Sequence, residues 1–307
     1  MDPLGSRTMW RHPLAMVCGL AILATGLAVA LPGWLGAESS DAVPSDGARL
    51  VSLTPAVTET LVALGAGEQL VGRSDFCPTV GLSEGVPMVG TTLQPNFEGL
   101  VRARPDHILA TEAGSLADDA LRQIAPTTAL PWRTVPEMIE SVRTLGKLVG
   151  KEGASDALAL RLQTEVLKDP PKGAPRLLLL LGYGALTDGQ LWFIKPGSLH
   201  DQVLRAAGAQ NAISEAVEGA PSMPLEQLLT LDPDLIIVLS PKDAMTDAEQ
   251  ASLVEPLTRM TTLRASSAGR LGVLVRANVL GEGPGLLEVV APLRAMVTEL
   301  MAKPVTP

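Results

Sequence analysis

The sequence predicts an α/β protein in which two similar lobes are joined by one long helix. Short apolar runs alternate with helical patterns along the chain, which indicates parallel β-α units. Residues 136–168, near the middle, carry one continuous helical pattern. A segment that precedes this pattern is repeated after it. At 307 residues the chain has room for two domains of ordinary size.

The N-terminal segment resembles an export signal. Arg7 and Arg11 precede an uncharged apolar stretch from Pro13 to Ala37, the order of charges found in signal peptides. The stretch is almost long enough to span a bilayer, and it ends in a poor cleavage site. We expect residues 1–37 to be a signal peptide or a retained membrane anchor, and residues 38–47 to be a polar spacer. The body of the protein is then periplasmic or otherwise extracytoplasmic.

Buried strands and short helices alternate in both expected lobes, residues 48–134 and 170–307. The run of leucines in 176–181 has no polar alternation, which is typical of a strand covered on both faces. The strands expected from short apolar runs are 49–53, 70–73, 107–110, 176–182, 235–240 and 270–275. The helices expected between them are 58–64, 97–102, 116–124, 199–206 and 225–229.

Residues 135–169 are expected to form the linking helix. Apolar residues recur there at three- and four-residue spacing, and Pro136 lies near the start, where a missing N–H costs least. Asp169 is followed by two prolines, which end the helix. A helix of about 30 residues would be about 45 Å long and would couple the lobes stiffly. Gly150 and Gly153 are the positions at which it would break or bend.

The repeat lies on either side of this helix. Glu98 opens a short helical pattern that Pro105 and Asp106 end, and a buried strand follows; Glu226, Pro233 and Asp234 do the same 128 positions later. A proline disfavours the α conformation in the residue before it, so each helix is expected to end just before its proline. The symmetric placement favours a duplicated α/β lobe.

Several classes of function are disfavoured. A formal charge of −9 argues against nucleic-acid binding. No P-loop or GxSxG motif occurs, and Gly281-Glu-Gly-Pro-Gly285 fails the dinucleotide spacing. Beyond the apolar segment the only cysteine is Cys77 and the only histidines are His107 and His200, so we expect no catalytic residue, no metal site and no cofactor. We interpret His107 as a packed strand residue, His200 as a solvated helix-capping residue and Cys77 as a small half-buried residue.

Several segments resemble the cobalamin, haem and ferric-siderophore binding proteins of ABC importers. They include Arg49-Leu-Val-Ser-Leu-Thr-Pro-Ala-Val-Thr-Glu59, Val89-Gly-Thr-Thr-Leu-Gln-Pro-Asn-Phe-Glu98 and Gly197-Ser-Leu-His-Asp-Gln-Val-Leu204. The resemblance covers residues 48–300 and leans towards the vitamin B12-binding branch. It implies two Rossmann-like lobes joined by a long helix (the class III periplasmic-binding-protein fold), a monomer, and a ligand held between the lobes.

The same resemblance implies a partner, an ABC permease dimer with its ATPase subunits. In the family one acidic residue on each lobe engages arginines of the permease, and by motif position these are Glu98 and Glu226. A two-fold symmetric partner suits two equivalent positions on similar lobes. The alternative is that each glutamate only complements the dipole of its helix.

Aromatic residues make up 3% of the chain, and a cleft for a macrocycle needs flat apolar contacts. We expect ligand contacts from Phe76, Trp132, Tyr183 and Trp192, and polar contacts from Arg73 and Arg276. A corrinoid ranks first as ligand because it brings its own metal ligands. Haem ranks second, through Tyr183, and a siderophore third. The segment 281–285 lacks an arginine often seen nearby in relatives. A membrane-anchored bilobed sensor that binds a partner protein is the alternative of another class, and an enzyme is disfavoured.

Overall fold

The computed structural model describes residues 47–77, 81–112, 118–182 and 189–304. Residues 41–307 cluster as one compact unit. The expected signal segment and nearly all of the expected spacer, residues 1–46, lie outside the described residues. Within the described ranges no helix is both long and apolar enough to cross a bilayer.

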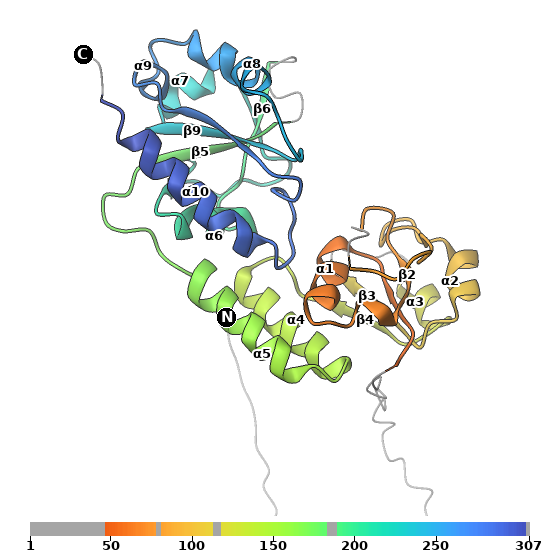
Figure 1. Ribbon diagram of the computed structural model, residues 1–307. Helices are drawn as coiled ribbons and strands as arrows, with labels where there is room; N and C mark the ends of the chain where they lie inside the picture. The colour runs from red at the N-terminus through yellow and green to blue at the C-terminus, as the bar shows by residue number, and fades with distance from the viewer. Residues whose placement is uncertain (1–46, 78–80, 113–117, 183–188, 305–307) are drawn as a thin grey trace, which may run out of the picture. The chain divides into compact units, whose positions relative to one another are not determined.

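The first lobe is a four-stranded parallel sheet with the strand order β2-β1-β3-β4. Apolar side chains of helix α1 (Pro55–Ala63) pack on one face of this sheet, and those of α2 (Phe97–Ala103) and α3 (Asp118–Arg122) pack on the other (Figure 1). A short 3-10 turn, η1 (Gly67–Gln69), precedes β2. The strands are β1 (Leu50–Ser52), β2 (Leu70–Arg73), β3 (His107–Thr111) and β4 (Thr127–Leu130).

The second lobe repeats this topology, with the parallel order β10-β9-β5-β7. Helices α6 (Leu199–Ala206) and α10 (Leu286–Met301) cover one face. The other face carries α7 (Gln227–Leu231), α8 (Asp247–Thr258) and α9 (Arg264–Ser267). The strands are β5 (Arg176–Leu181), β7 (Gln210–Asn211), β9 (Leu235–Ser240) and β10 (Leu271–Val275), with a separate antiparallel pair of β6 (Gln190–Trp192) and β8 (Ser222–Pro224).

Two of these strands confirm the prediction from unbroken apolar runs. Every residue of β9 is buried, and so are the four central leucines of β5. A strand with a helix layer on each face loses water from both sides, so alternation with polar residues would leave polar groups unpaired.

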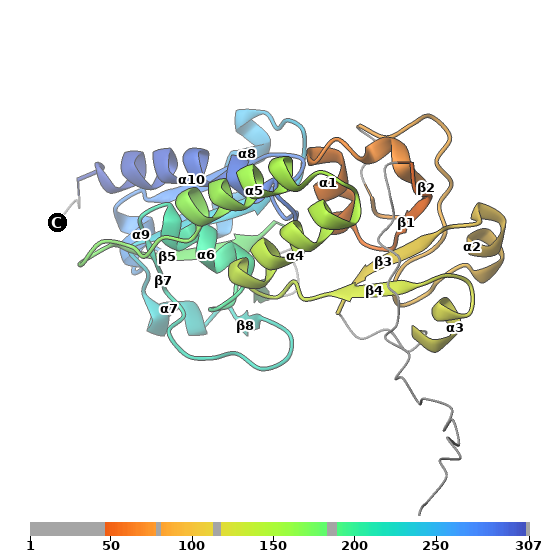
Figure 2. The same cartoon turned by 90° about the horizontal axis from the view of Figure 1, so that it is seen from below.

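The linking segment differs from the single long helix that the sequence predicts. It consists of α4 (Val135–Leu148), α5 (Glu152–Arg161) and a π-helical turn, η2 (Leu162–Val166). The break falls at Gly150, whose φ of 67° is left-handed and ends the first helix. The second helix then runs back along the first, with Arg143 paired to Asp156 at 3.6 Å (Figure 2). The prediction of one 45 Å helix is therefore wrong: the segment is a helical hairpin.

The hairpin joins the hydrophobic cores of the two lobes. One cluster of buried apolar residues runs from α1 through α4 and α5 to α6 and α10. The amphipathic α4 buries Met138, Val142 and Leu145 in it, each fully inaccessible to solvent. Because the lobes share this core, the connection is a packed layer and not a free linker.

The repeat is confirmed in its hydrogen bonds. The main-chain N–H of Arg49 donates to a carboxylate oxygen of Asp106 at 2.8 Å, and that of Arg176 donates to Asp234 at 2.8 Å. Each arginine side chain also donates to carbonyl oxygens at the end of the repeated helix, α2 or α7. Both helices end in a left-handed residue just before the proline, Arg104 and Asp232. The two lobes therefore use one device to end this helix and start the next strand.

Candidate functional site

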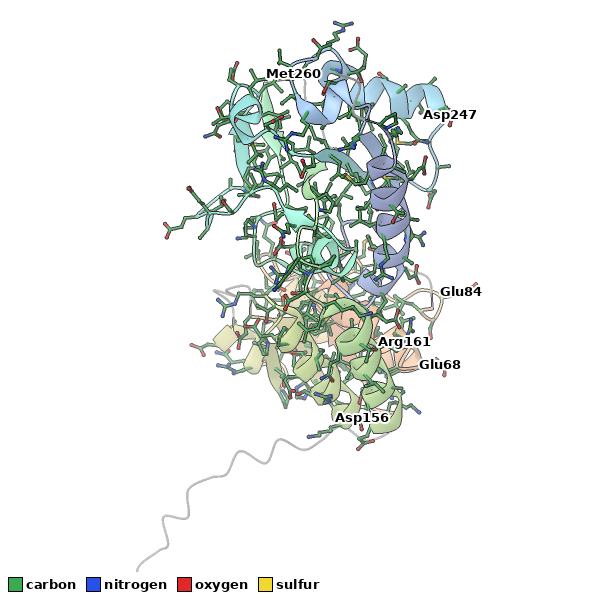
Figure 3. All side chains as sticks on the ribbon, turned by 90° about the vertical axis from the view of Figure 1, so that its left-hand side faces the viewer. Glu68, Glu84, Asp156, Arg161, Asp247 and Met260 are labelled. Carbon is green, nitrogen blue, oxygen red and sulfur yellow. The ribbon has the colours of Figure 1, made fainter. Side chains whose placement is uncertain are left out.

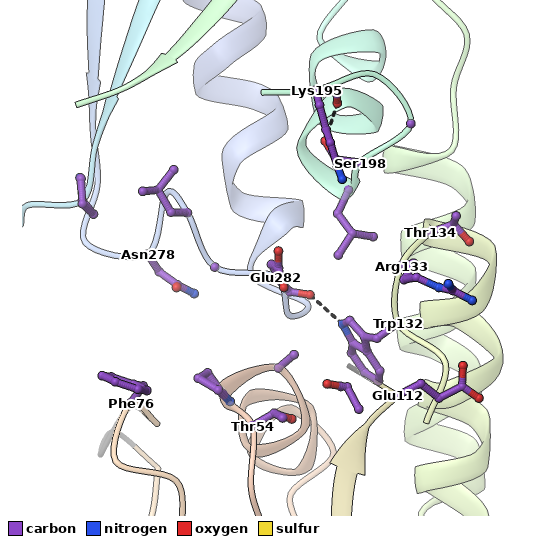
Figure 4. A pocket seen from close by; sticks show the side chains of 18 of the residues that line it. Thr54, Phe76, Glu112, Trp132, Arg133, Thr134, Lys195, Ser198, Asn278 and Glu282 are labelled. Atoms are coloured by element: carbon purple, nitrogen blue, oxygen red, sulfur yellow. Dashed lines mark hydrogen bonds between the residues drawn. The ribbon is translucent and has the colours of Figure 1, made fainter. Parts of the chain in front are cut away.

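A cavity of about 910 Å³ lies between the two lobes (Figure 4). Most of its wall is formed by residues at or just after the carboxyl ends of strands in the two parallel sheets, and Lys195–Leu199 follows β6 of the antiparallel pair. Ligands of open α/β sheets bind at this edge, because the loops there are free to carry side chains that a packed strand cannot. The described lining is Thr54–Ala56, Phe76, Thr111, Glu112, Trp132–Thr134, Lys195–Leu199, Pro241, Ala277, Asn278 and Leu280–Glu282.

Two aromatic side chains lie on the wall formed by the first lobe. Phe76 follows β2 and is 78% exposed, so its ring is open to whatever occupies the cavity. Trp132 follows β4 and is 6% exposed. Its indole Nε1–H donates to the carbonyl oxygen of Glu282 in the second lobe at 2.8 Å (Figure 4). The structure thus brings together two of the four aromatic residues expected to contact the ligand, one exposed and one anchored.

The facing wall comes from two segments of the second lobe. One precedes and begins α6, where Ser198 caps the helix by accepting from the main-chain N–H of Asp201 at 3.2 Å. The other is the segment between β10 and α10, which contributes Asn278 and Glu282. His200 supports that segment, since its Nε2–H donates to the carbonyl oxygen of Val279 at 3.1 Å.

His200 and Cys77 are both buried, which bears on what the sequence predicts for each. The expected solvated role of His200 is wrong: the side chain is 7% exposed, and burial lowers the pKa of its imidazole. Cys77 is 6% exposed, and its thiol lies 2.9 Å from the hydroxyl of Thr58. Cys77 is therefore more buried than the half-buried residue expected, and this burial raises the pKa of its thiol.

The charges on the cavity wall balance. Glu112 and Glu282 supply two carboxylates, and Arg133 and Lys195 supply two cations. The side chain of Glu282 keeps access to the cavity, but the surrounding protein removes enough water to raise its pKa. The described wall therefore has no net charge when these four groups are ionised. It is better suited to a ligand whose rim is polar but neutral than to a ligand of high charge.

The other residues expected to bind ligand lie elsewhere. Arg73 donates to the carbonyl oxygens of Ser74 and Cys77 at 3.3 and 3.2 Å and is not among the lining residues. Arg276 lines a second cavity of about 340 Å³ and pairs with Glu288 at 3.3 Å. Trp192 is the last residue of β6 and is not among the lining residues, which begin three residues later at Lys195. Tyr183 lies outside the described residues. Ligand contact by these four stays a prediction.

Sequence reasoning missed most of the polar wall. Glu112 and Asn278 follow strands that were correctly placed, so the strand-end rule applied to polar as well as aromatic residues would have found them. Lys195 follows β6, a three-residue strand too short for periodicity to reveal. Over the ranges that the structure describes, no group of three or more histidine, cysteine, aspartate or glutamate residues is placed to hold a metal ion.

The two glutamates of the repeat are both exposed. Glu98 lies in the first turn of α2, where its carboxylate pairs with Arg102 at 2.6 Å. Glu226 is the N-cap residue of α7. Next to each, a leucine at the equivalent position, Leu100 or Leu228, is fully buried and fixes the helix to its lobe. Each glutamate is therefore presented on a firmly packed helix start.

Comparison with known proteins shows which proteins share this arrangement. A family profile described as "Periplasmic binding protein" matches residues 50–272, well over half of the chain. Among curated proteins, a cobalamin-binding protein of Halobacterium salinarum strain R1 is 26% identical over 262 residues, covering 80% of this chain and 68% of that protein. A vitamin B12-binding protein of Pectobacterium carotovorum is 26% identical over 227 residues, covering 71% of this chain and 80% of that protein.

A solved structure agrees with both the fold and the family. A periplasmic haem-binding protein from Pseudomonas aeruginosa superposes with a TM-score of 0.65 at 26% identity, covering 84% of this chain and 95% of that one. The predicted fold class is thereby confirmed, with the hairpin in place of a single linking helix.

Proposed function

The chain belongs to the periplasmic binding protein family, and from this premise we propose that it is the extracytoplasmic substrate-binding component of an ABC importer that carries a corrinoid. The ligand occupies the cavity between the lobes and is delivered to a permease dimer driven by ATPase subunits. The curated relatives whose names specify cobalamin or vitamin B12 support this ligand class.

The lining of the cavity is the observation that carries the corrinoid assignment. A corrinoid has a broad apolar macrocycle, a rim of neutral amides and its own metal ligands, so it needs flat contacts and neutral hydrogen-bonding partners. The described lining supplies the flat contacts through Phe76 and Trp132. It supplies the neutral partners through hydroxyl and amide side chains at Thr111, Thr134, Ser198 and Asn278.

Haem is the second candidate, because a haem-binding protein is similar in both sequence and structure. Haem iron takes a histidine, tyrosine, methionine or cysteine ligand from the protein. Among the lining residues that the structure describes, none is of these four types. Tyr183 directly follows the last residues described after β5 and is the residue that would have to serve.

Direct titration tests the assignment. The full-length protein, held in mild detergent so that its apolar N-terminal segment stays soluble, is titrated with cyanocobalamin, cobinamide, haemin and several ferric siderophores. Tryptophan fluorescence, visible absorption and calorimetry report binding. One-to-one binding of a corrinoid at micromolar affinity or better supports the proposal. If haemin or a siderophore binds and no corrinoid does, the proposed ligand class is wrong and the molecule that binds takes its place. If none of them binds, the alternative of a sensor that binds a partner protein is favoured.

Phe76 offers a sharper test of where the ligand lies. Its ring is 78% exposed, so Phe76→Ala leaves folding nearly unchanged while it removes a flat contact. We expect the Kd for cyanocobalamin to rise about fivefold, the size of one aromatic stacking contact. Leu93→Ala is the matched control, because Leu93 is 75% exposed and lies outside the cavity lining. Calorimetry that finds equal affinities for wild type and Phe76→Ala would contradict ligand contact by Phe76.

Docking to the permease is assigned to Glu98 and Glu226. Their exposure, their placement at equivalent helix starts and the pseudo-symmetry of the lobes support this role, since a permease dimer presents two similar surfaces. Exposed carboxylates contribute orientation and association rate more than affinity. Ligand binding to the isolated protein is therefore expected not to depend on either glutamate.

A further inference from the structure

The glycine-rich segment 281–285 has no role in the ligand contacts proposed above beyond its share of the wall. It connects β10 to α10 in the second lobe. In the structure it is the part of that lobe that meets α1 and the β4 end of the first lobe. Its glycines and its neighbour Asn278 therefore belong to an interlobe contact.

Glu59 is the centre of this contact. It lies half-buried in α1, and one oxygen of its carboxylate accepts a hydrogen bond from the main-chain N–H of Gly285. The other oxygen accepts from the side-chain amide of Asn278 at 3.3 Å. We call Glu59, Asn278, Gly283 and Gly285 the interlobe clasp. The bond from Trp132 to Glu282 lies on the same segment.

Gly283 and Gly285 leave the space that the Glu59 carboxylate occupies. A β-carbon at Gly283 or Gly285 would meet the carboxylate of Glu59 at less than a contact distance. Gly285 has φ −58°, a conformation open to any residue. A side chain at Gly285 would therefore meet the Glu59 carboxylate first and the Asn278 amide next, and Glu59 and Gly285 are physically coupled although they are 226 residues apart.

The carboxylate is sheltered from water. Burial raises the pKa of Glu59, and the hydrogen bonds from Gly285 and Asn278 oppose this rise; the negative charge of nearby Glu288 adds to it. Glu288 is itself paired with Arg276 at 3.3 Å. Hydrogen bonds to a desolvated carboxylate are strong, because water competes poorly for either partner.

We propose that Glu59 is the positioning residue that holds the Asn278–Gly285 wall of the cavity against the first lobe, and that its hydrogen bonds break when the lobes spread. Asn278 both lines the cavity and donates to Glu59, so the clasp fixes a ligand-contacting side chain. The part of the proposal that concerns ligand release rests on the proposed function. The part that concerns lobe position does not.

The lobe position is measured without ligand. Spin labels are placed at Glu68→Cys in the first lobe and Asp247→Cys in the second, both exposed (Figure 3), in a full-length Cys18→Ser, Cys77→Ser background. Electron–electron double resonance gives the distance distribution. We expect a wider, longer distribution in Glu59→Ala and in Gly285→Ala, and no further change when the two are combined. Glu59→Gln keeps an oxygen for the Gly285 N–H, and its new NH2 can donate to the Asn278 side-chain oxygen once that amide turns over, so it should restore the wild-type distribution.

Ligand release is measured separately, by the dissociation rate of cyanocobalamin. Glu59→Ala removes both hydrogen bonds of the clasp and should raise this rate at least about tenfold, the effect of losing a single charge-assisted hydrogen bond. Glu59→Gln should leave the rate unchanged. Unchanged distances in Glu59→Ala and Gly285→Ala, or changes that simply add in the double variant, would overturn the clasp. If wild-type protein binds no cobalamin, the proposed ligand fails while the distances still decide the clasp. If Glu59→Ala does not fold, Gly285→Ala, in the other lobe, carries the comparison.

Discussion

At the scale of single residues, His200 makes the sharpest prediction about pH. Its imidazole is buried and donates to the carbonyl oxygen of Val279, and burial lowers its pKa from the ordinary value of about 6.5. The folded protein therefore keeps the imidazole neutral at a pH where the unfolded chain protonates it. Stability contributed in this way is present above the unfolded pKa and is lost as pH falls below it, by at most ~1.4 kcal/mol per pH unit.

The variant His200→Gln isolates this effect, since glutamine can donate an N–H to the same carbonyl but does not titrate. We expect wild type to be the more stable protein at pH 8, and its advantage in free energy of unfolding to shrink as the pH is lowered to 5.5. Urea denaturation at several pH values measures this. An advantage that stays constant with pH would show that folding does not lower the pKa of His200.

At the scale of elements, the helical hairpin predicts that the same glycine-to-alanine substitution destabilises the protein at one position and stabilises it at another. Gly146 in α4 faces Ser155 in α5 so closely that a β-carbon on Gly146 would overlap the serine side chain. Ser155 is buried, and its hydroxyl donates to the main-chain carbonyl oxygen of Glu152 at 2.9 Å, which holds it in place. Gly146→Ala should therefore destabilise the protein by about 1–3 kcal/mol, the cost of overpacking. A thermal melt with a transition at or above the wild-type temperature would contradict this packing.

Gly153 is the matched control. It lies in α5, and an added β-carbon there would meet nothing within 4 Å. Alanine has the higher helix propensity, so Gly153→Ala should stabilise the protein by about 0.5–1 kcal/mol. The same substitution in two neighbouring helices should thus shift the melting temperature in opposite directions.

The elements also show which parts of the fold the sequence can predict. Strands β5 and β9 were found because continuous burial leaves a continuous apolar run. Strand β4 (Thr127–Leu130) was not, because its threonines are only partly buried and leave no apolar pattern. Helix α10 contains Pro292, which argues against a helix on local grounds but is tolerated by packing on the second sheet. Gly150 was named as a break, yet only the structure shows that the chain reverses there.

The candidate site divides in the same way. Phe76 and Trp132 were expected to contact the ligand because aromatic residues are few in this chain and a cleft for a macrocycle needs flat apolar contacts. Glu59 and Asn278 lie 219 residues apart, and their contact exists only because the two lobes meet. No local pattern marks such a contact, although the glycines of segment 281–285 record the space it needs.

At the scale of the whole molecule, the repeat places Glu98 and Glu226 at equivalent positions, but their surroundings differ. Glu98 pairs with Arg102 one turn later, both side chains being exposed. At the equivalent position the second lobe has Thr230. Among the ion pairs of the described residues none involves Glu226. Glu98 and Glu226 therefore share a place in the repeat but differ in local charge and in their exact position at the helix start, the first turn of α2 and the N-cap of α7.

This inequality predicts unequal docking. In the proposed docking role, Arg102 would compete with the permease arginines for Glu98 and repel them, whereas Glu226 would be open to them. Arg102→Ala should raise the association rate with permease in nanodiscs about twofold, the scale of an exposed ion pair, and Thr230→Ala should leave it unchanged. Glu226→Ala should slow association more than Glu98→Ala, with every difference shrinking at high salt because exposed charges are screened. The double variant Glu98→Ala, Glu226→Ala should bind ligand normally and fail in transport, and normal transport by it would remove both glutamates from the docking surface.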